Sequence, residues 1–217
     1  MAYKAVIFDL DGTLLDTLDD LHASVSVALE KNGFVTRSRE EIRAFLGNGV
    51  QELIHKSVPE GTDLETEAQV LTDFKAHYAK HSAEKTKPYK DVNLLIRVLS
   101  GEGVMRAIVS NKPDSAAQDL AAEYFPGMFN AVVGERAGIS RKPAPDTVNA
   151  VIERLGLSRE DTVYVGDSEV DIETAKNAGI DCVCVSWGFR SEEQLRKSGA
   201  ERIAPDAEKL AEELLFY

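Results

Sequence analysis

The fold is decided by the stretch Lys4-Ala5-Val6-Ile7-Phe8-Asp9-Leu10-Asp11-Gly12-Thr13-Leu14-Leu15-Asp16, in which two carboxylates directly follow an apolar run. The run from residue 4 to residue 8 has the length and composition of a strand that is buried on both faces. Four similar runs follow along the chain, at residues 105–109, 131–133, 162–165 and 182–185. They alternate with stretches of helical periodicity, which predicts an α/β fold with a doubly wound, Rossmann-like parallel sheet as its core.

The alternation of strands and helices is interrupted directly after the first strand. Between residues 17 and 83 the apolar periodicity predicts four helices and no strand. Two of these helices begin with the pattern of a capping box, Ser38 with Glu41 and Thr62 with Glu65. The sequence therefore predicts a small helical bundle inserted into the α/β fold.

The helical insert divides the chain into two domains. We expect a catalytic α/β core domain formed by residues 1–15 and 85–217, and an α-helical cap domain formed by residues 16–84. Residues 85–90, which contain Pro88, have the composition of a linker that returns the chain to the core.

Acidic residues outnumber basic ones, with 37 Asp and Glu against 25 Lys and Arg and a formal net charge of −12. Nucleic-acid binding requires a basic surface, so we expect no nucleic-acid partner. No apolar run reaches the roughly 18 residues of a membrane span, and the N-terminal residues lack the pattern of a secretory signal. The two cysteines, Cys182 and Cys184, are expected to be reduced. We therefore predict a cytoplasmic protein, a monomer or weak homodimer, without a membrane partner.

Polar side chains follow three of the predicted strands, at the edge of the sheet where ligands bind in open α/β folds. These residues, with a lysine that precedes a later helix, are Asp9, Asp11, Ser110, Asn111, Asp167, Asp171 and Lys142. Most have a simpler explanation when taken alone: an Asp-Gly turn, the start of a helix, a solvated lysine, or a capping box of Ser168 with Asp171. Asp167 is harder to explain in this way, because it directly follows a buried strand.

Together these residues indicate phosphoryl-transfer chemistry. Asp9, Asp11 and Asp167 would repel one another strongly in a buried site, and a hard divalent cation relieves that repulsion. Mg²⁺ prefers one or two carboxylates together with phosphate oxygens and water. A carboxylate nucleophile, a second carboxylate for proton transfer, a lysine and Mg²⁺ are the groups that phosphoryl transfer uses. We therefore predict a small phosphorylated metabolite as the substrate and Mg²⁺ as the cofactor.

The same residues resemble the motifs of a known family. Residues 9–16 look like the first motif of the haloacid dehalogenase superfamily. Ser110, Lys142 and the segment Gly166–Asp171 stand where its second, third and fourth motifs would. The helical insert resembles the small α-helical cap of that superfamily, so the resemblance extends over essentially the whole chain. It implies a hydrolase whose cap closes over the site and excludes water.

The resemblance implies a role for each catalytic residue. Asp9 would attack phosphorus and form an aspartyl-phosphate. Asp11 would protonate the leaving oxygen and then activate the water that hydrolyses this intermediate. Ser110 and Lys142 would hold the phosphoryl oxygens, and Lys142 would also hold Asp9 in place.

The resemblance also implies the composition of the metal site. Asp9, Asp167 and the backbone carbonyl of Asp11 would bind Mg²⁺. Asp171 is assigned to the same site, next to the direct ligands.

Five further residues are assigned to substrate binding. Thr13 and Asn111 would orient neighbouring groups. Gly47 and Asn48, in the cap segment 46–50, and Arg190, in the segment 186–190, resemble positions in phosphoglycolate phosphatases. Gly47 also fits a flexible turn between two helices. Arg190 would meet a substrate carboxylate or, alternatively, be a surface arginine.

Asp11, the second carboxylate of the first motif, limits the reactions that the resemblance allows. Members of the superfamily that cleave carbon–halogen bonds or phosphonates lack an acid at the position of Asp11. The resemblance therefore implies a Mg²⁺-dependent phosphatase acting on a small phosphate monoester, with 2-phosphoglycolate as the best candidate. The alternatives are a sugar-phosphate mutase of the same superfamily, a pyrophosphatase, and a non-catalytic binding relative. The presence of Asp9, Asp11, Lys142 and Asp167 argues against the last.

Overall fold

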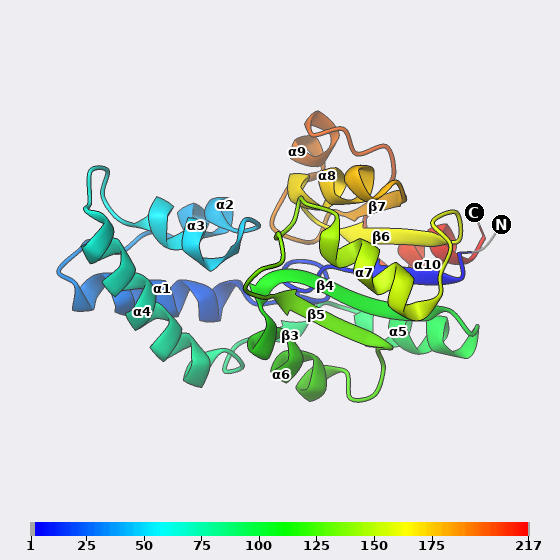
Figure 1. The fold of residues 1–217 in the computed structure, drawn as a ribbon, viewed down its shortest axis with the longest axis horizontal. Helices are drawn as coiled ribbons and strands as arrows, with labels where there is room; N and C mark the ends of the chain where they lie inside the picture. Colours follow the sequence, from blue (N-terminus) through cyan, green and yellow to red (C-terminus); the bar gives the residue numbers. More distant parts are fainter. Residues whose placement is uncertain (1–2, 217) are drawn as a thin grey trace.

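The computed structural model describes residues 3–216 and confirms the predicted α/β class (Figure 1). Its main sheet contains six parallel strands in the order β5-β4-β1-β6-β7-β8. The strands are β1 (Ala5–Phe8), β4 (Met105–Pro113), β5 (Ala131–Glu135), β6 (Thr162–Gly166), β7 (Asp181–Val185) and β8 (Ile203–Ala204). The sequence predicts all of them except the edge strand β8, which is too short to carry a periodic signal.

Helices cover both faces of the sheet. Successive residues of a strand point to opposite faces, so the side chains on both sides of a strand are buried against helices. The core helices are α5 (Val92–Gly101), α6 (Asp114–Tyr124), α7 (Asp146–Leu155), α8 (Glu169–Ala178), α9 (Glu192–Lys197) and α10 (Ala207–Leu215). On β1, Val6 and Phe8 belong to a hydrophobic cluster with residues of α5, α6 and α10. Ile7, between them, belongs to a second cluster with residues of α7 and α8. This burial on both faces explains why β1 is a continuous apolar run.

Four helices form the lobe at the left of Figure 1 and have a hydrophobic cluster of their own. They are α1 (Leu18–Lys31), α2 (Arg39–Phe45), α3 (Gly49–Ser57) and α4 (Leu64–His81). Leu29, Ile42, Ile54 and Phe74 are buried in this cluster, which one residue from the other lobe, Phe189, also joins. We refer to the segment from α1 to α4, with its connecting turns, as the cap and to the rest of the described chain as the core.

The chain passes between the two lobes twice, and the two crossings pair with each other. β2 (Leu15–Asp16) and β3 (Lys87–Pro88) form a short antiparallel ladder. Beside it, the buried carboxylate of Asp20 accepts hydrogen bonds from the backbone N–H groups of Lys85 and Thr86 and from the Thr86 hydroxyl, at 2.8–3.0 Å. The return segment is therefore a paired and hydrogen-bonded strand rather than the simple linker that its composition indicates.

The end of β4 differs from the prediction. The strand continues to Pro113 instead of ending at residue 109, and its register against β5 shifts between Val109 and Pro113. Ser110 and Asn111 therefore lie in the strand and do not begin the following helix. The irregular pairing is a tertiary feature, which local periodicity does not reveal.

The start of α4 is also predicted wrongly. Its N-cap is Asp63, whose carboxylate accepts a hydrogen bond from the backbone N–H of Thr66. The Thr62 hydroxyl instead donates to the carbonyl of Pro59 at 2.7 Å. Both residue types are good N-caps, and the preceding turn decides between them. The other predicted capping box in the cap, Ser38 with Glu41, is confirmed.

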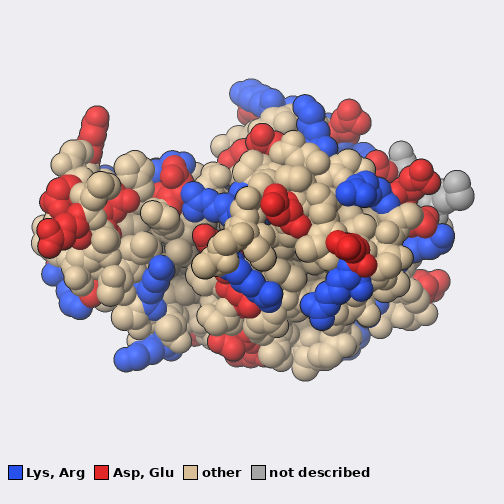
Figure 2. Space-filling view, viewed as in Figure 1, with Lys and Arg blue, Asp and Glu red and all other residues tan. Residues whose placement is uncertain are grey.

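Charged side chains are dispersed over the surface. On the face shown in Figure 2, acidic and basic groups are interspersed over both lobes. Among residues 3–216, no helix combines the length and the apolar character that crossing a bilayer requires.

Replacing Asp20 by alanine is expected to lower the free energy of unfolding by about 1–3 kcal/mol, because buried donors of Thr86 lose their acceptor. Asp19→Ala is the matched control, since this neighbouring carboxylate is 48% exposed and pairs with Arg39 at the surface. Denaturant unfolding of the two variants measures the difference. Equal losses would contradict the role of Asp20 in fixing the return segment.

Candidate active site

Three buried carboxylates meet at the carboxyl ends of adjacent strands. β1 lies between β4 and β6, so Asp9, which follows β1, lies between Ser110 on β4 and Asp167 after β6. Asp171, in the first turn of α8, completes the group. One oxygen from each of Asp9, Asp167 and Asp171 lies within 4.8 Å of the others. A compact set of carboxylate oxygens is the donor set that a hard divalent cation prefers.

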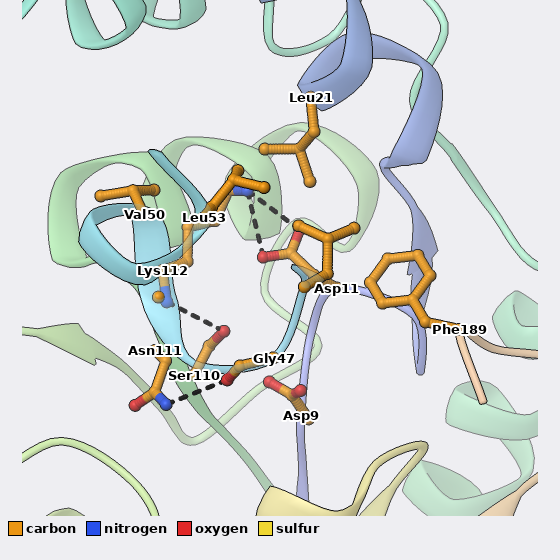
Figure 3. Close-up of a pocket in the computed structure, with 12 residues that line it drawn as sticks. Asp9, Asp11, Leu21, Gly47, Val50, Leu53, Ser110, Asn111, Lys112 and Phe189 are labelled. Carbon is orange, nitrogen blue, oxygen red and sulfur yellow. Dashed lines mark hydrogen bonds and ion pairs between the residues drawn. The ribbon is translucent and has the colours of Figure 1, made fainter. Parts of the chain in front are cut away.

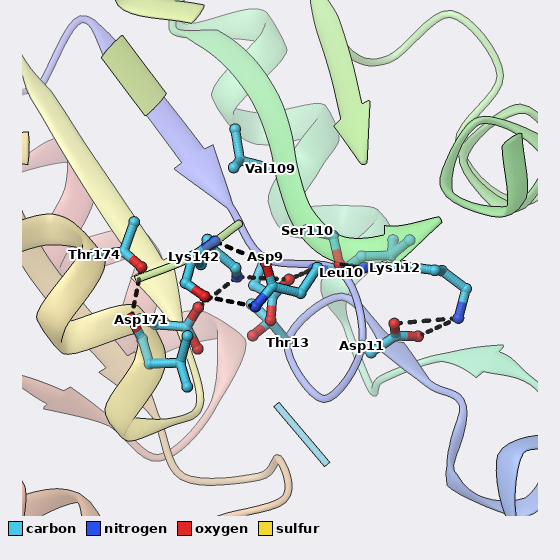
Figure 4. A network of polar contacts seen from close by, with 12 residues as sticks. Asp9, Leu10, Asp11, Thr13, Val109, Ser110, Lys112, Lys142, Asp171 and Thr174 are labelled. Carbon is cyan, nitrogen blue, oxygen red and sulfur yellow. Dashed lines mark hydrogen bonds and ion pairs between the residues drawn. The ribbon is translucent and has the colours of Figure 1, made fainter. Parts of the chain in front are cut away.

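Lys142 supplies a positive charge to this cluster (Figure 4). Its Nζ lies 3.1 Å from Oδ1 of Asp9 and 2.7 Å from Oδ1 of Asp171. It also donates to the hydroxyl of Tyr164 at 2.9 Å, and this hydroxyl in turn donates to the carbonyl of Val109 at 2.9 Å. The ammonium group is thus buried and fixed by three oxygen atoms.

The cluster carries more negative charge than Lys142 balances. Burial raises the pKa of Asp9 to about 7 against the opposing effect of Lys142, and repulsion from Asp171 adds to the rise. Burial, with the charges of Asp171 and Asp9, also holds the pKa of Asp167 well above its ordinary value. Burial would lower the pKa of Lys142, but Asp171 and Asp9 raise it, so this group stays charged. A divalent cation next to Asp9 and Asp167 would relieve the remaining repulsion.

The carboxylate of Asp171 is held by protein donors. Its Oδ1 pairs with Lys142, and its Oδ2 accepts hydrogen bonds from the backbone N–H groups of Asp167 and Ser168 and from the Ser168 hydroxyl. The predicted capping box of Ser168 with Asp171 is confirmed. Because its Oδ1 pairs with an ammonium group and its Oδ2 already accepts three hydrogen bonds, the geometry favours Asp171 as the residue that orients Lys142 and the turn before α8.

Asp167 is oriented from two sides. Its Oδ1 accepts a hydrogen bond from the Thr13 hydroxyl at 3.0 Å, and its Oδ2 accepts one from the backbone N–H of Phe189 at 2.7 Å. Two glycines leave room for this side chain. A Cβ added at Gly188 would lie 2.4 Å from the Cβ of Asp167, and one added at Gly12 would lie 2.4 Å from its Oδ2. Thr13, assigned to substrate binding, therefore contacts the carboxylate of Asp167.

The carboxylate of Asp11 is turned toward the cap (Figure 3). Its two oxygens lie 2.9 and 3.1 Å from Nζ of Lys112. Lys112 directly follows Ser110 and Asn111 in the sequence, but it is not among the predicted site residues. Its contact with Asp11 depends on the extension of β4, which the sequence does not predict.

A pocket lies between the core acids and the cap (Figure 3). It is lined by Asp9, Asp11, Leu21, Leu46, Gly47, Gly49, Val50, Leu53, Ser110, Asn111, Lys112 and Phe189. The polar members come from the core, whereas the apolar ones come from the cap, with Phe189 as the exception. The pocket therefore has a charged floor and a largely apolar roof, and both lobes are needed to form it.

Asn111 connects the cap to the core at this pocket. Its Nδ2 donates to the carbonyls of Gly47 and Lys142, at 3.1 and 3.0 Å, and its Oδ1 accepts the backbone N–H of Lys142 at 2.9 Å. Gly47 lies at the pocket, in the turn between α2 and α3. The structure thus brings Asn111 and Gly47 together with Asp9, Asp11 and Ser110.

Arg190 and Asn48 are not among the residues that line the pocket. The guanidinium of Arg190 donates to the carboxylate of Glu169 and to the backbone carbonyls of Arg43 and Leu46. It is buried, so its interpretation as a surface arginine is wrong. These protein acceptors hold it at the cap–core boundary, whereas Asn48 is the N-cap residue of α3.

Besides the apolar residues that line the pocket, the residues of the site that are absent from the sequence-based prediction include Lys112, Tyr78, Tyr164 and Gly188. Of these residues, only Lys112 could have been predicted from the sequence, because it is a charged residue that directly follows two site candidates at the end of a buried strand. The two tyrosines look like ordinary core residues in the sequence. Their hydroxyl groups acquire partners only in the folded protein, where Tyr78 of α4 meets Lys112 and Tyr164 of β6 reaches past β1 to the carbonyl of Val109 on β4.

Comparison with known proteins identifies the family. The sequence model described as haloacid dehalogenase-like hydrolase matches residues 6–185. The chain belongs to this family. The resemblance of the strand-end residues to the motifs of the superfamily is thereby confirmed.

Relatives and solved structures of this haloacid dehalogenase-like hydrolase agree with that result. The chain is 35% identical over 189 residues to a phosphoglycolate phosphatase of Cereibacter sphaeroides, with 85% of this chain and 86% of that protein covered. It is 32% identical over 214 residues to a phosphoglycolate phosphatase of Pseudomonas savastanoi pv. phaseolicola, with 95% and 78% covered. A solved structure, a provisionally named phosphoglycolate phosphatase from Lactobacillus delbrueckii subsp. bulgaricus, matches with a TM-score of 0.95 and 40% identity over 100% of both chains.

Gly188→Ala is expected to weaken Mg²⁺ binding by about tenfold or more, because the added Cβ would displace the carboxylate of Asp167. Gly101→Ala is the control, since nothing lies within 4 Å of a Cβ added there. Calorimetric titration of both variants with Mg²⁺ measures the effect. Unchanged affinity in a folded Gly188→Ala protein would show that Asp167 does not take part in the metal site.

Proposed function

We propose that this protein is a phosphatase that hydrolyses a small phosphate monoester, with 2-phosphoglycolate as the preferred substrate. The observation that carries the proposal is the gathering of Asp9, Asp11, Lys142 and Asp167 at one edge of the sheet, beside a pocket closed by the cap. The names of the relatives from C. sphaeroides and P. savastanoi support phosphoglycolate as the substrate.

Asp9 is the proposed nucleophile. A carboxylate oxygen of Asp9 attacks the phosphorus atom, and an aspartyl-phosphate forms as the bond from phosphorus to the alcohol oxygen breaks. Lys142, 3.1 Å from Oδ1 of Asp9, keeps this carboxylate in place and offsets its negative charge. Ser110 lies at the pocket beside Asp9, where its hydroxyl would donate to a phosphoryl oxygen.

Asp11 is the proposed acid and base. Its carboxyl group gives a proton to the alcohol oxygen as that oxygen leaves phosphorus. The resulting carboxylate then takes a proton from the water whose oxygen attacks the aspartyl-phosphate and releases Asp9. The apolar cap residues at the pocket, Leu21 and Leu53 among them, exclude other water while the ester is broken.

Asp9, Asp167 and the backbone carbonyl of Asp11 are the proposed Mg²⁺ ligands. When bound, Mg²⁺ supplies positive charge that neutralises the phosphoryl oxygens and the neighbouring carboxylates. Thr13 and the backbone N–H of Phe189 keep Asp167 oriented for this role.

The size of the pocket supports a small substrate. The free space in the pocket is about 40 Å³, and apolar side chains from α1 and α3 restrict it above the core acids. This restriction disfavours a large leaving group, which supports a compact ester such as 2-phosphoglycolate.

Asp9→Asn is expected to reduce phosphate release from 2-phosphoglycolate by about 10³-fold or more, because the amide cannot act as the nucleophile. Phosphate release is measured across a panel of metabolites with Mg²⁺, and mass spectrometry excludes deamidation of the variant. Asp19→Asn, at the surface of the cap, is the control. Wild-type turnover by Asp9→Asn would contradict the nucleophile, while a requirement for a sugar bisphosphate would indicate a mutase.

The affinity for Mg²⁺ is expected to rise between about pH 6 and pH 8. Burial raises the pKa of Asp9 to about 7, so this group is mostly protonated below that pH and ionised above it. Because Mg²⁺ binds the carboxylate, binding displaces the proton and becomes easier as the pH rises. Calorimetry in two buffers measures both the affinity and the proton release. An affinity that does not change with pH would contradict Asp9 as a ligand.

A further inference from the structure

Lys112 is a buried cation that the proposed mechanism does not use. Its side chain is 2% exposed, and its Nζ lies 2.9 and 3.1 Å from the two oxygens of Asp11. The third neighbour is the hydroxyl of Tyr78, which accepts a hydrogen bond from Nζ at 2.7 Å. The ammonium also lies 4.6 Å from the centroid of the Tyr78 ring. Its three hydrogen-bond directions therefore lead to Asp11 and to Tyr78.

These contacts join the two lobes at the proposed acid and base. Lys112 is on β4 of the core, whereas Tyr78 is on α4 of the cap. The Tyr78 ring is itself fixed, because it stacks on Phe74 with a centroid distance of 5.4 Å and an interplanar angle of 9°. The hydroxyl that accepts from the ammonium thus belongs to a stacked aromatic pair in the cap hydrophobic cluster.

The charged form of Lys112 depends energetically on Asp11 and Tyr78. Burying an ammonium group is strongly destabilising unless its charge is paired and its protons form hydrogen bonds. Burial would lower the pKa of Lys112, but Asp11 and Tyr78 raise it above its ordinary value. The charged lysine is therefore stable here only while both neighbours remain in place. The contact also constrains Asp11, because a lysine that is bonded to both oxygens of a carboxylate restricts its rotation.

We propose that Lys112 and Tyr78 are positioning residues that set the orientation of Asp11 for proton transfer. The inference rests on the proposed function of Asp11. Lys112 acts through Asp11, and Tyr78 acts through Lys112. The cap thereby contributes to the chemistry through a hydrogen bond, in addition to covering the pocket.

Lys112→Met is expected to lower kcat/KM for 2-phosphoglycolate by about tenfold or more, because a misdirected Asp11 protonates the alcohol oxygen poorly. The loss for 4-nitrophenyl phosphate is expected to be several times smaller, since its phenolate leaves with little help from an acid. Tyr78→Phe keeps the ring on Phe74 and removes one acceptor, so a smaller loss with the same substrate dependence is expected. Lys75→Met, an exposed lysine of α4, is the control and should change neither value.

A double-mutant cycle separates positioning from other roles. With 4-nitrophenyl phosphate, Lys112→Met is expected to have no further effect on kcat/KM when Asp11 is already asparagine. The proposal would be overturned if the losses of kcat/KM from the two single substitutions multiply in the double variant. It would also be overturned if Lys112→Met lowers kcat/KM equally for 2-phosphoglycolate and for 4-nitrophenyl phosphate. An increase in KM with unchanged kcat would also overturn it and would place Lys112 on the substrate. If Lys112→Met does not fold, Tyr78→Phe and Lys112→Arg provide the same comparison.

Failure of this inference is distinguishable from failure of the proposed function. If the wild-type protein releases no phosphate from any monoester, the phosphatase proposal itself is wrong. If the wild-type protein is active and Asp11→Asn impairs it, but the Lys112 and Tyr78 variants behave like Lys75→Met, then only the positioning role is wrong.

Discussion

The repulsion among Asp9, Asp167 and Asp171 is the constraint on which the rest of the structure depends. Asp9 and Asp171 share the ammonium of Lys142. Asp167 instead accepts hydrogen bonds from the Thr13 hydroxyl and the Phe189 N–H, so the three carboxylates stay close because the protein supplies these further donors. The parallel sheet brings the acids together, and the turn before α8 donates backbone N–H groups to Asp171. The negative charge that remains unbalanced is a reason to expect a cation beside Asp9 and Asp167.

The cap is attached to the core mainly through directional polar contacts. Arg43 of α2 donates to the carbonyls of Gly188 and Phe189, and Arg190 donates back to the carbonyls of Arg43 and Leu46. A polar interface between two lobes permits relative motion more readily than a large apolar interface does. The proposed function uses such motion, because the cap would admit the substrate and then cover it. The hydrogen bond from Lys112 to Tyr78 belongs to the same boundary.

Local signals in the sequence predict much of the fold. The apolar runs mark the principal strands because both faces of the sheet are covered, and the capping boxes at Ser38 and Ser168 form as expected because their partners are three residues away. The prediction is wrong at Thr62, where an adjacent aspartate is an equally good cap. It is also wrong at the end of β4, where pairing with β5 extends the strand. In both cases a contact outside the local pattern decides between two acceptable structures.

The sequence by itself determined the α/β class, the helical insert and the acidic residues that follow β1 and β6. These features depend on periodicity and on the rule that parallel strands end at a common edge, so they can be read without coordinates. Only the tertiary structure decided the partners of those residues. Asp171 holds Lys142, Arg190 bonds to the cap backbone, and Lys112 meets Asp11 beneath Tyr78. Such pairings join residues that are distant in the chain, so local sequence patterns do not reveal them. They form because a buried charge is stable only when it is paired, and the packing of the helices and strands decides which partner is near.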